Sequence, residues 1–181
     1  MARNSANTAY NIWISNSAYF VSGDVGNWVH FAMTMDFDGT GIIYKNGSAV
    51  TTNKTGSETT IRNVSEDVYI GNDGTTRYMD GLIDEFGYWT KILTADEVSD
   101  LYNGGDGLPY NAPADVSTDD DLPTSLQGYW TLDESSDGTG AVTREDSTAN
   151  GNDLTDGNTT PSATGILNSG ADFETSNSEY L

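Results

Sequence analysis

Cysteine is absent from the 181 residues of this chain, and histidine occurs once, at His30. Disulfide bonds and thiolate metal sites are therefore excluded, as is a zinc site built on paired histidines. No apolar run approaches the roughly 18 residues of a membrane-spanning helix, so we expect no membrane insertion. The first residues also lack the apolar segment of a signal peptide.

Basic residues are scarce as well: 7 lysines and arginines stand against 28 acidic residues, a formal net charge of −21. Nucleic acids and anionic membrane surfaces need a basic patch, so neither is an expected partner. The acidity has two interpretations. It is a solubilising surface suited to salty water, where counterions screen self-repulsion, or it provides carboxylates for divalent cations.

The stretch 78–102 contains the most specific local pattern. Residues 82–89 alternate with period two and have apolar or aromatic side chains on both sides, which predicts a β-strand covered on both faces. A short helix is then predicted after Thr94, because Thr94 and Glu97 have the spacing of a capping box. Asn103 and the glycines after it predict the end of this helix in the left-handed conformation.

Further strands are predicted upstream. Residues 10–15 and 18–22 are short aromatic runs separated by a polar pair, which favours a hairpin. Residues 28–37 alternate as a strand that is buried on at least one face. Asn46 and Gly47 between two apolar runs predict a second hairpin with a type I′ turn, because both central positions of that turn need positive φ.

These segments resemble a laminin-G-like domain of the concanavalin A-like lectin/glucanase superfamily. The sequences that carry the resemblance are GLIDE at 81–85, LTADEVSDLY at 93–102, NWVHFAMT at 27–34, YKNG at 44–47 and VYIG at 68–71. The resemblance implies an all-β fold, a two-sheet antiparallel β-sandwich of the jelly-roll type with one short helix.

The resemblance also implies an unusual order of the two halves. Residues 10–110 resemble the second half of such a domain, whereas residues 126–181, with LQGYWTLDES and DSTANGND, resemble the first. Residues 111–125 contain prolines and an acidic run without apolar periodicity, which predicts a linker. We expect the halves to complete one sandwich as a circular permutation. The alternative is pairing with a neighbouring chain, in a strand-exchanged oligomer.

A calcium site is predicted near the second half. The loop 146–153 concentrates carboxylate and amide oxygens, the ligands that calcium prefers, and Gly151 lets the backbone fold around an ion. Domains of the resembled family often bind calcium between this loop and the aspartate of the I-D-E strand, which implies the ligands Asp84, Asp146, Asn150 and the Gly151 carbonyl. The alternative is that these Asp and Asn side chains only form Asx turns.

Catalysis is not expected. Some glucanases of the resembled superfamily use a strand motif E-x-D-x-x-E with two carboxylates as nucleophile and acid/base. Leu82 stands where the nucleophile is required, and Asp84 and Glu85, as neighbours in a strand, are expected to point to opposite faces. His30 lies within a predicted strand, where we expect it to pack or to form hydrogen bonds.

The sequence therefore predicts a non-catalytic recognition module that binds a glycan or a protein at an extracellular, cell or virion surface, with calcium as its cofactor. Sugar faces stack on exposed aromatic rings, and the candidate contact residues are Trp13, Tyr19, Tyr78 and Trp89. Two alternatives are a structural or assembly repeat of a fibre or surface protein and, more remotely, a glycoside hydrolase.

Overall fold

The computed structural model describes residues 2–3, 10–36, 40–57, 68–74, 76–110, 122–123 and 125–181. They form two compact units. The first unit contains the described residues of 1–66 and 92–108, and the second contains those of 67–91, 109–112 and 121–181. No helix in these described residues is long and apolar enough to cross a membrane.

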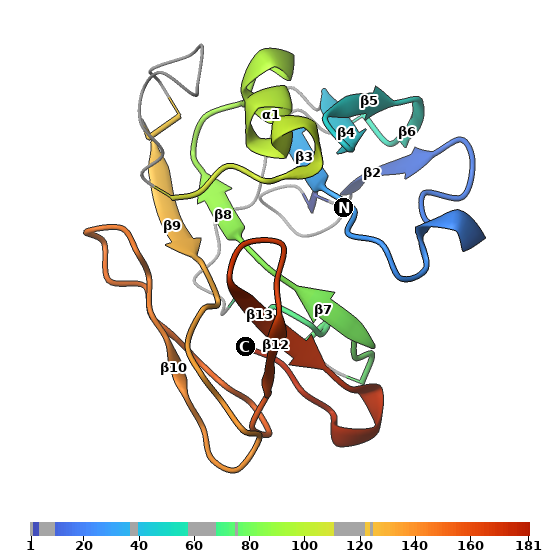
Figure 1. The fold of residues 1–181 in the computed structure, drawn as a ribbon. Helices are drawn as coiled ribbons and strands as arrows, with labels where there is room; N and C mark the ends of the chain where they lie inside the picture. Colours follow the sequence, from blue (N-terminus) through green and yellow to red (C-terminus); the bar gives the residue numbers. More distant parts are fainter. Residues whose placement is uncertain are drawn as a thin grey trace. The chain divides into compact units, whose positions relative to one another are not determined.

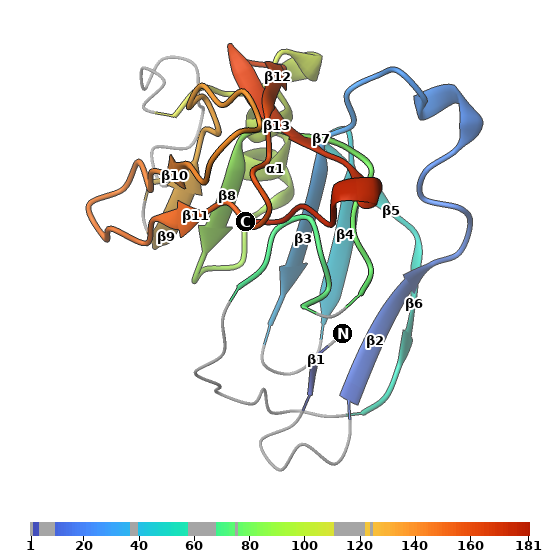
Figure 2. The same ribbon diagram turned by 90° about the horizontal axis from the view of Figure 1, so that it is seen from below.

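The first unit contains two small antiparallel sheets, a helix and two 3-10 turns. Its sheets have the strand orders β1-β2-β6 and β3-β4-β5, and their paired strands lie side by side in Figure 2. The elements are β1 (Ala2–Arg3), β2 (Tyr10–Ser15), η1 (Ser22–Asp24), β3 (Phe31–Met35), β4 (Gly41–Lys45), β5 (Ser48–Val50), β6 (Thr52–Thr55), α1 (Ala95–Tyr102) and η2 (Asn103–Gly105).

The turn between β4 and β5 is the predicted one. Asn46 and Gly47 have φ values of 50° and 73°, and the ladder closes around them with Lys45 opposite Ser48. The Tyr102 ring lies against the bare face of Gly47, where an added Cβ would stand 3.0 Å from the ring. Glycine is therefore required both by the turn and by the helix that covers it.

Helix α1 begins and ends at the predicted residues (Figure 1). The Thr94 hydroxyl accepts a hydrogen bond from the Glu97 N–H (3.1 Å), and the Glu97 carboxylate accepts one from the Thr94 N–H (2.7 Å). Val98 is fully buried, and Asn103 ends the helix at φ 48°. Near this helix, the rings of His30 and Tyr102 lie 5.9 Å apart.

The predicted hairpin of residues 10–15 and 18–22 is wrong. Strand β2 pairs with β1 and β6 instead, and residues 18–22 lead into the 3-10 turn η1 without forming a strand. The Asp24 carboxylate fixes that turn by accepting a hydrogen bond from the Val21 N–H (2.8 Å). A local cap therefore replaces the strand that the aromatic pattern predicts.

The second unit contains three antiparallel sheets, with the orders β12-β13-β7, β8-β9 and β10-β11. Its elements are β7 (Gly81–Ile83), β8 (Phe86–Trp89), β9 (Leu126–Trp130), β10 (Thr143–Arg144), β11 (Leu154–Thr155), β12 (Ser162–Thr164), β13 (Ser169–Phe173) and η3 (Thr175–Asn177). A hydrophobic core fills the unit, formed by Ile70, Trp130, Leu132, Ala171, Phe173 and Leu181, with Ile83, Phe86 and Leu154 packed against it.

Strands from both predicted halves meet in this unit. Strand β7 pairs with β13 and β8 pairs with β9, while Ile70 and Leu181 exchange two backbone hydrogen bonds of 2.9 Å. The boundaries 10–110 and 126–181 stay predictions. The linker 111–125 lies mostly outside the described residues.

The predicted continuous strand over residues 82–89 is interrupted. Strand β7 ends at Ile83 and β8 begins at Phe86, because Glu85 adopts the left-handed conformation with φ 54°. The alternation used to place Asp84 and Glu85 on opposite faces therefore does not hold across the break. The broader prediction of an all-β fold with one short α-helix is confirmed.

Candidate functional site

The loop 146–153 is held by hydrogen bonds that converge on the Asp146 carboxylate. Its Oδ1 accepts from the backbone N–H groups of Tyr129 (3.1 Å) and Thr148 (2.9 Å). Its Oδ2 accepts from the Thr148 hydroxyl (2.9 Å) and the Asn152 N–H (2.9 Å). An ionised carboxylate has about four lone-pair sites, so the loop and the Tyr129 N–H of β9 together saturate Asp146.

These bonds also set the charge of Asp146. Burial alone would raise the pKa of its carboxyl group, but the donors from Asn152, Thr148 and Tyr129 outweigh that effect and hold the pKa below its usual range. The side-chain amides of Asn150 and Asn152 donate to the Gln127 carbonyl (3.0 and 2.7 Å), which docks the loop onto β9. The geometry is that of the Asx-turn alternative.

Only some of the predicted ligands suit a calcium site. Calcium takes six to eight oxygens at about 2.3–2.6 Å, and an ion at Asp146 would have to displace existing hydrogen bonds. Gly151 is exposed with φ 68°, so its backbone is accessible. No hydrogen bond between described residues links this loop to Asp84. Across the same residues, no group of three or more His, Cys, Asp or Glu side chains is placed to hold a metal ion.

Asp84 is engaged elsewhere in the second unit. Its Oδ2 accepts from the backbone N–H groups of Ile166 (2.7 Å) and Leu167 (2.9 Å). Its Oδ1 is buried and accepts no hydrogen bond from the described residues. Of the carboxylate oxygens of the predicted ligand set, this one is left available for a cation or a proton.

Asp84, Glu85 and Asp133 form an acidic cluster, and Tyr129 lies against it. Burial raises the pKa of the Glu85 carboxyl to about 7, and the negative charges of Asp84 and Asp133 add to the effect, opposed by a hydrogen bond with Tyr129. Burial also raises the pKa of Asp84 to about 6, against the two backbone donors. The pKa values of Asp84 and Glu85 are therefore both raised toward neutral pH.

The sequence pattern misses this cluster. Asp133 lies in the WTLDES segment and accepts hydrogen bonds from the Ser169 N–H (2.9 Å) and the Asn168 amide (3.2 Å). Those contacts hold it near residues 84–85, which are far away in the sequence. The sequence signal for it is an apolar residue followed by Asp-Glu, which occurs at 83–85 and again at 132–134, and its meaning depends on the fold.

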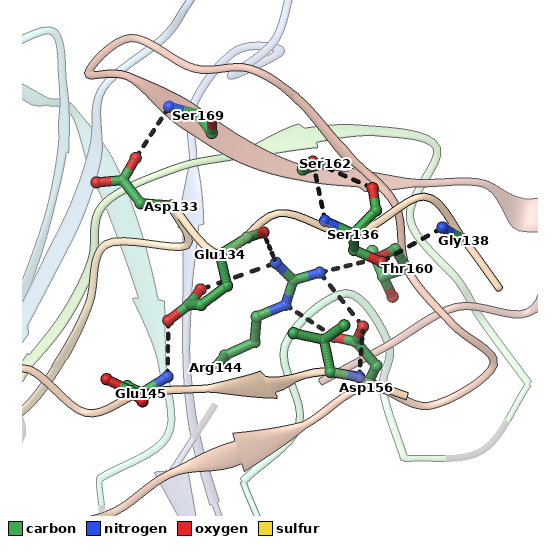
Figure 3. Close-up of polar contacts among 11 residues, drawn as sticks. Asp133, Glu134, Ser136, Gly138, Arg144, Glu145, Asp156, Thr160, Ser162 and Ser169 are labelled. Atoms are coloured by element: carbon green, nitrogen blue, oxygen red, sulfur yellow. Dashed lines mark hydrogen bonds and ion pairs between the residues drawn. The ribbon is translucent and has the colours of Figure 1, made fainter. Parts of the chain in front are cut away.

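A buried arginine lies beneath the neighbouring loops (Figure 3). The Arg144 side chain has 0% exposure and pairs with an equally buried Asp156, with Nε 2.9 Å from Oδ1. Nη1 donates to the Glu134 carbonyl (2.8 Å) and Nη2 to the Thr160 carbonyl (2.7 Å). The guanidinium therefore links residues 134, 156 and 160, and its charge is paired within the unit.

The four aromatic residues predicted to contact a ligand are distributed over both units. Those whose interactions are described contact other residues of the protein. The Tyr19 hydroxyl donates to the Tyr44 carbonyl (2.6 Å), and the Trp89 indole N–H donates to the Leu122 carbonyl (2.7 Å). Tyr78 is half-buried and forms a bridge with Asn72. Trp13 lies in β2, but its side chain is outside the described part of the structure.

More exposed rings surround Tyr19. Phe20 is 65% exposed and Phe31 is 55% exposed, with ring centroids 4.8 Å and 5.5 Å from that of Tyr19, both edge-on. The Lys45 ammonium lies 5.5 Å from the Tyr19 ring centroid and is paired with Asp24 at 2.6 Å. We name Tyr19, Phe20, Phe31 and Lys45 the aromatic surface.

Comparison with known proteins places these features in a family. The sequence model of the concanavalin A-like lectin/glucanases superfamily, in its laminin G form, matches residues 2–99. The chain belongs to this superfamily. No curated protein and no solved structure matches the chain. The match confirms the resemblance of the first segment, whereas the resemblance of residues 126–181 and the reversed order stay predictions.

Proposed function

We propose that the chain is a non-catalytic recognition module that binds a glycan or a protein at an extracellular or particle surface. The observation that carries the proposal is the aromatic surface of the first unit. Contiguous exposed apolar groups mark interaction sites on soluble proteins. Aromatic rings also provide a large contact area at low conformational cost.

The aromatic surface is held in place. The Tyr19 hydroxyl bonds to the Tyr44 carbonyl, and Lys45 donates to the Tyr19 carbonyl (2.8 Å) while pairing with Asp24. Phe20 and Phe31 contact the fixed Tyr19 ring and remain largely exposed. A ligand therefore meets two rings already positioned and a cation beside them, which lowers the entropic cost of binding.

An array of glycans and surface proteins tests the proposal. We expect the variant with both Phe20→Ala and Phe31→Ala to lose the binding shown by the native chain. Tyr88→Ala is the matched control, because Tyr88 is 58% exposed but belongs to the second unit. Equal binding by the double variant and the native chain would contradict the proposal.

Calcium binding by the second unit is part of the proposed function. The available Asp84 Oδ1 and the exposed Gly151 backbone support it, and the saturated Asp146 opposes it. Domains of the matched superfamily often bind calcium, and this precedent implies the ligand set Asp84, Asp146, Asn150 and Gly151 in this chain. The ion would stabilise the folded unit, with no part in chemistry.

We also propose that residues 126–181 complete a sandwich with the first segment, in permuted order. The β7–β13 and β8–β9 ladders support this arrangement, because each joins strands from the two segments. A monomer follows if the ladders form within one chain. A strand-exchanged oligomer, the basis of an assembly role, follows if they form between chains.

A glycoside hydrolase is the second candidate, favoured by the acidic cluster. Carboxylates with pKa values raised to about 6 and 7 are suited to general acid catalysis near neutral pH. Against this role, Asp84 accepts two backbone hydrogen bonds and Leu82 stands at the position that the superfamily nucleophile requires. Release of reducing sugar from β-glucans that Glu85→Gln abolishes would favour the hydrolase over the recognition module.

A further inference from the structure

Asparagine is followed directly by glycine at three places in the sequence, 46–47, 103–104 and 150–151. Such a pair is prone to a spontaneous covalent change, because glycine has no Cβ to hinder the attack of its own backbone nitrogen on the preceding side-chain amide. The attack closes a five-membered ring only when that nitrogen lies on the same side as the asparagine Cβ. The backbone conformation of each asparagine therefore decides which pair can react.

Two of the pairs are held in a conformation that prevents the attack. Asn46 and Asn103 are left-handed, with φ values of 50° and 48°, and the left-handed region has ψ values of about +30 to +60°. With ψ in this range the next backbone nitrogen points away from the Cβ. Contacts keep both residues there: the Asn46 side-chain oxygen accepts from the His30 N–H (3.0 Å), and the Asn103 amide donates to the Gly107 carbonyl (2.8 Å).

The third pair lacks these restraints. Asn150 is exposed and is not in the left-handed conformation. Gly151 is exposed as well, and a Cβ added there would meet no atom within 4 Å. Its N–H donates no hydrogen bond to any residue that the structure describes. The attacking nitrogen is therefore accessible and unrestrained.

We propose that Asn150 is a site of spontaneous deamidation, and that of the three asparagine–glycine pairs it is the one that reacts in the folded chain. The Gly151 nitrogen gives up its proton to hydroxide and bonds to the Asn150 Cγ. The bond from Cγ to Nδ2 breaks, and ammonia leaves. Water then opens the resulting succinimide at either carbonyl and leaves aspartate or isoaspartate. The net change is the exchange of one amide for one carboxylate, with water consumed and ammonia released.

The reaction removes a contact that docks the loop 146–153 onto β9. The Asn150 amide nitrogen donates to the carbonyls of Leu126 (3.3 Å) and Gln127 (3.0 Å), and this nitrogen is the leaving group. The carboxylate that replaces it has no donor and meets two carbonyl oxygens. Asn152 still donates to the Gln127 carbonyl (2.7 Å). Deamidation therefore adds a negative charge to the second unit and loosens one of the two asparagine contacts that hold the loop.

Peptide mapping by mass spectrometry, after incubation of the full chain at mildly alkaline pH, tests the proposal. We expect Asn150 to convert at least about tenfold faster than Asn46 and Asn103, because those two must first leave their turn or helix end. A tenfold ratio corresponds to an opening cost of about 1.4 kcal/mol. In urea, which removes the conformational difference, the three rates should converge. Asn152 is the internal control: it bonds to the same carbonyl but precedes Asp153, so it should keep its amide.

Two variants separate the reaction from its consequence. Asn150→Gln should stop conversion at this position, because the longer side chain would have to close a six-membered ring. Asn150→Asp carries the charge of the product from the start and should lower the urea midpoint relative to the unreacted native chain. Conversion of Asn150 in the folded chain no faster than that of Asn46 and Asn103 would overturn the proposal. A native urea midpoint for Asn150→Asp would refute the loosening of the loop.

Discussion

The Asp84 Oδ2 accepts a 2.7 Å hydrogen bond from the backbone N–H of Ile166, which lies 82 residues further along the chain. The same oxygen accepts from Leu167, so a carboxylate at the end of β7 anchors the turn between β12 and β13. The contact joins the two segments whose order is predicted to be reversed relative to the superfamily.

Asp84→Ala should therefore destabilise the second unit. Two N–H groups lose their acceptor, and we expect the free energy of unfolding to fall by about 2 kcal/mol, within the range for unsatisfied donors. Asp84→Asn is the matched control, because its amide oxygen can still accept both bonds. Urea denaturation measures both variants, and an alanine variant as stable as the native chain would show that the anchor is unimportant.

The acidic cluster makes stability fall as the pH rises. The folded-state pKa of Glu85, about 7, lies above its ordinary value of 4.5, so the folded state binds this proton more tightly than the unfolded chain does. The stabilisation is complete below about pH 4.5 and is lost as the pH rises through about 7. Asp84 shifts in the same direction, and Asp133 and Tyr129 are the other titratable groups that act on Glu85.

Glu85→Gln should flatten this dependence and make the variant more stable than the native chain at pH 8. Glu145→Gln, an exposed carboxylate outside the cluster, should retain the native slope. The measurement is the urea midpoint between pH 4.5 and 8. The predicted direction would be contradicted if the urea midpoint of the native chain rose across this pH window and Glu85→Gln abolished that rise.

Arg144→Met should destabilise the chain by about 3–5 kcal/mol, the usual cost of leaving a buried charge without its partner. Asp156 is the charge left behind, so adding Asp156→Leu should recover part of the loss. Arg77→Met is the control. It removes an arginine that is 89% exposed and pairs with Asp73 at 3.7 Å, a contact typically worth about 0–1 kcal/mol. Similar losses for the two arginines would refute the role of burial.

Calcium should raise the melting temperature if the proposed site forms. An ion that binds only the folded state adds about 2.7 kcal/mol at a hundredfold excess over its Kd. Scans in chelator and in millimolar calcium measure the shift, with magnesium as the control for general screening of the −21 charge. Equal melting temperatures in chelator and calcium would eliminate the site.

Light scattering should give a concentration-independent monomer if β7–β13 and β8–β9 form within one chain. Strand exchange between chains would produce a ladder of oligomers instead, because a head-to-tail interface that does not close extends into fibres. Such a ladder would favour the assembly role over the permuted monomer.

Local signals in the sequence were sufficient for two features that depend on neighbouring residues. The capping box of Thr94 and Glu97 and the Asn46-Gly47 turn follow from backbone geometry within four residues, and both occur as predicted. Residues 10–22 show the limit of this approach. Their aromatic pattern resembles a hairpin, but β2 finds its partner in β6, whose polar residues Thr52–Thr55 carry little strand signal.

The candidate site was harder to predict for the same reason. At the break after β7, Asp84 bonds to the distant residues 166 and 167, and the acidic cluster includes Asp133, which is also far away in the sequence. Neither relationship produces a periodic pattern in the sequence. The Asp146 loop was found from its composition, but composition alone does not distinguish a metal-binding loop from one in which hydrogen-bond donors of the protein saturate the carboxylate.

Because Arg144 is buried, proteolytic cleavage after it reports the opening of the second unit. Trypsin cuts after lysine and arginine, and only 7 such residues exist in the whole sequence. In the folded state the protease cannot reach the Arg144 side chain, which is fully buried, and the Arg144 backbone is paired with Leu154 in the β10–β11 ladder. A fragment that ends at this residue therefore appears only when the second unit opens, so its rate of appearance reports that opening without any added probe.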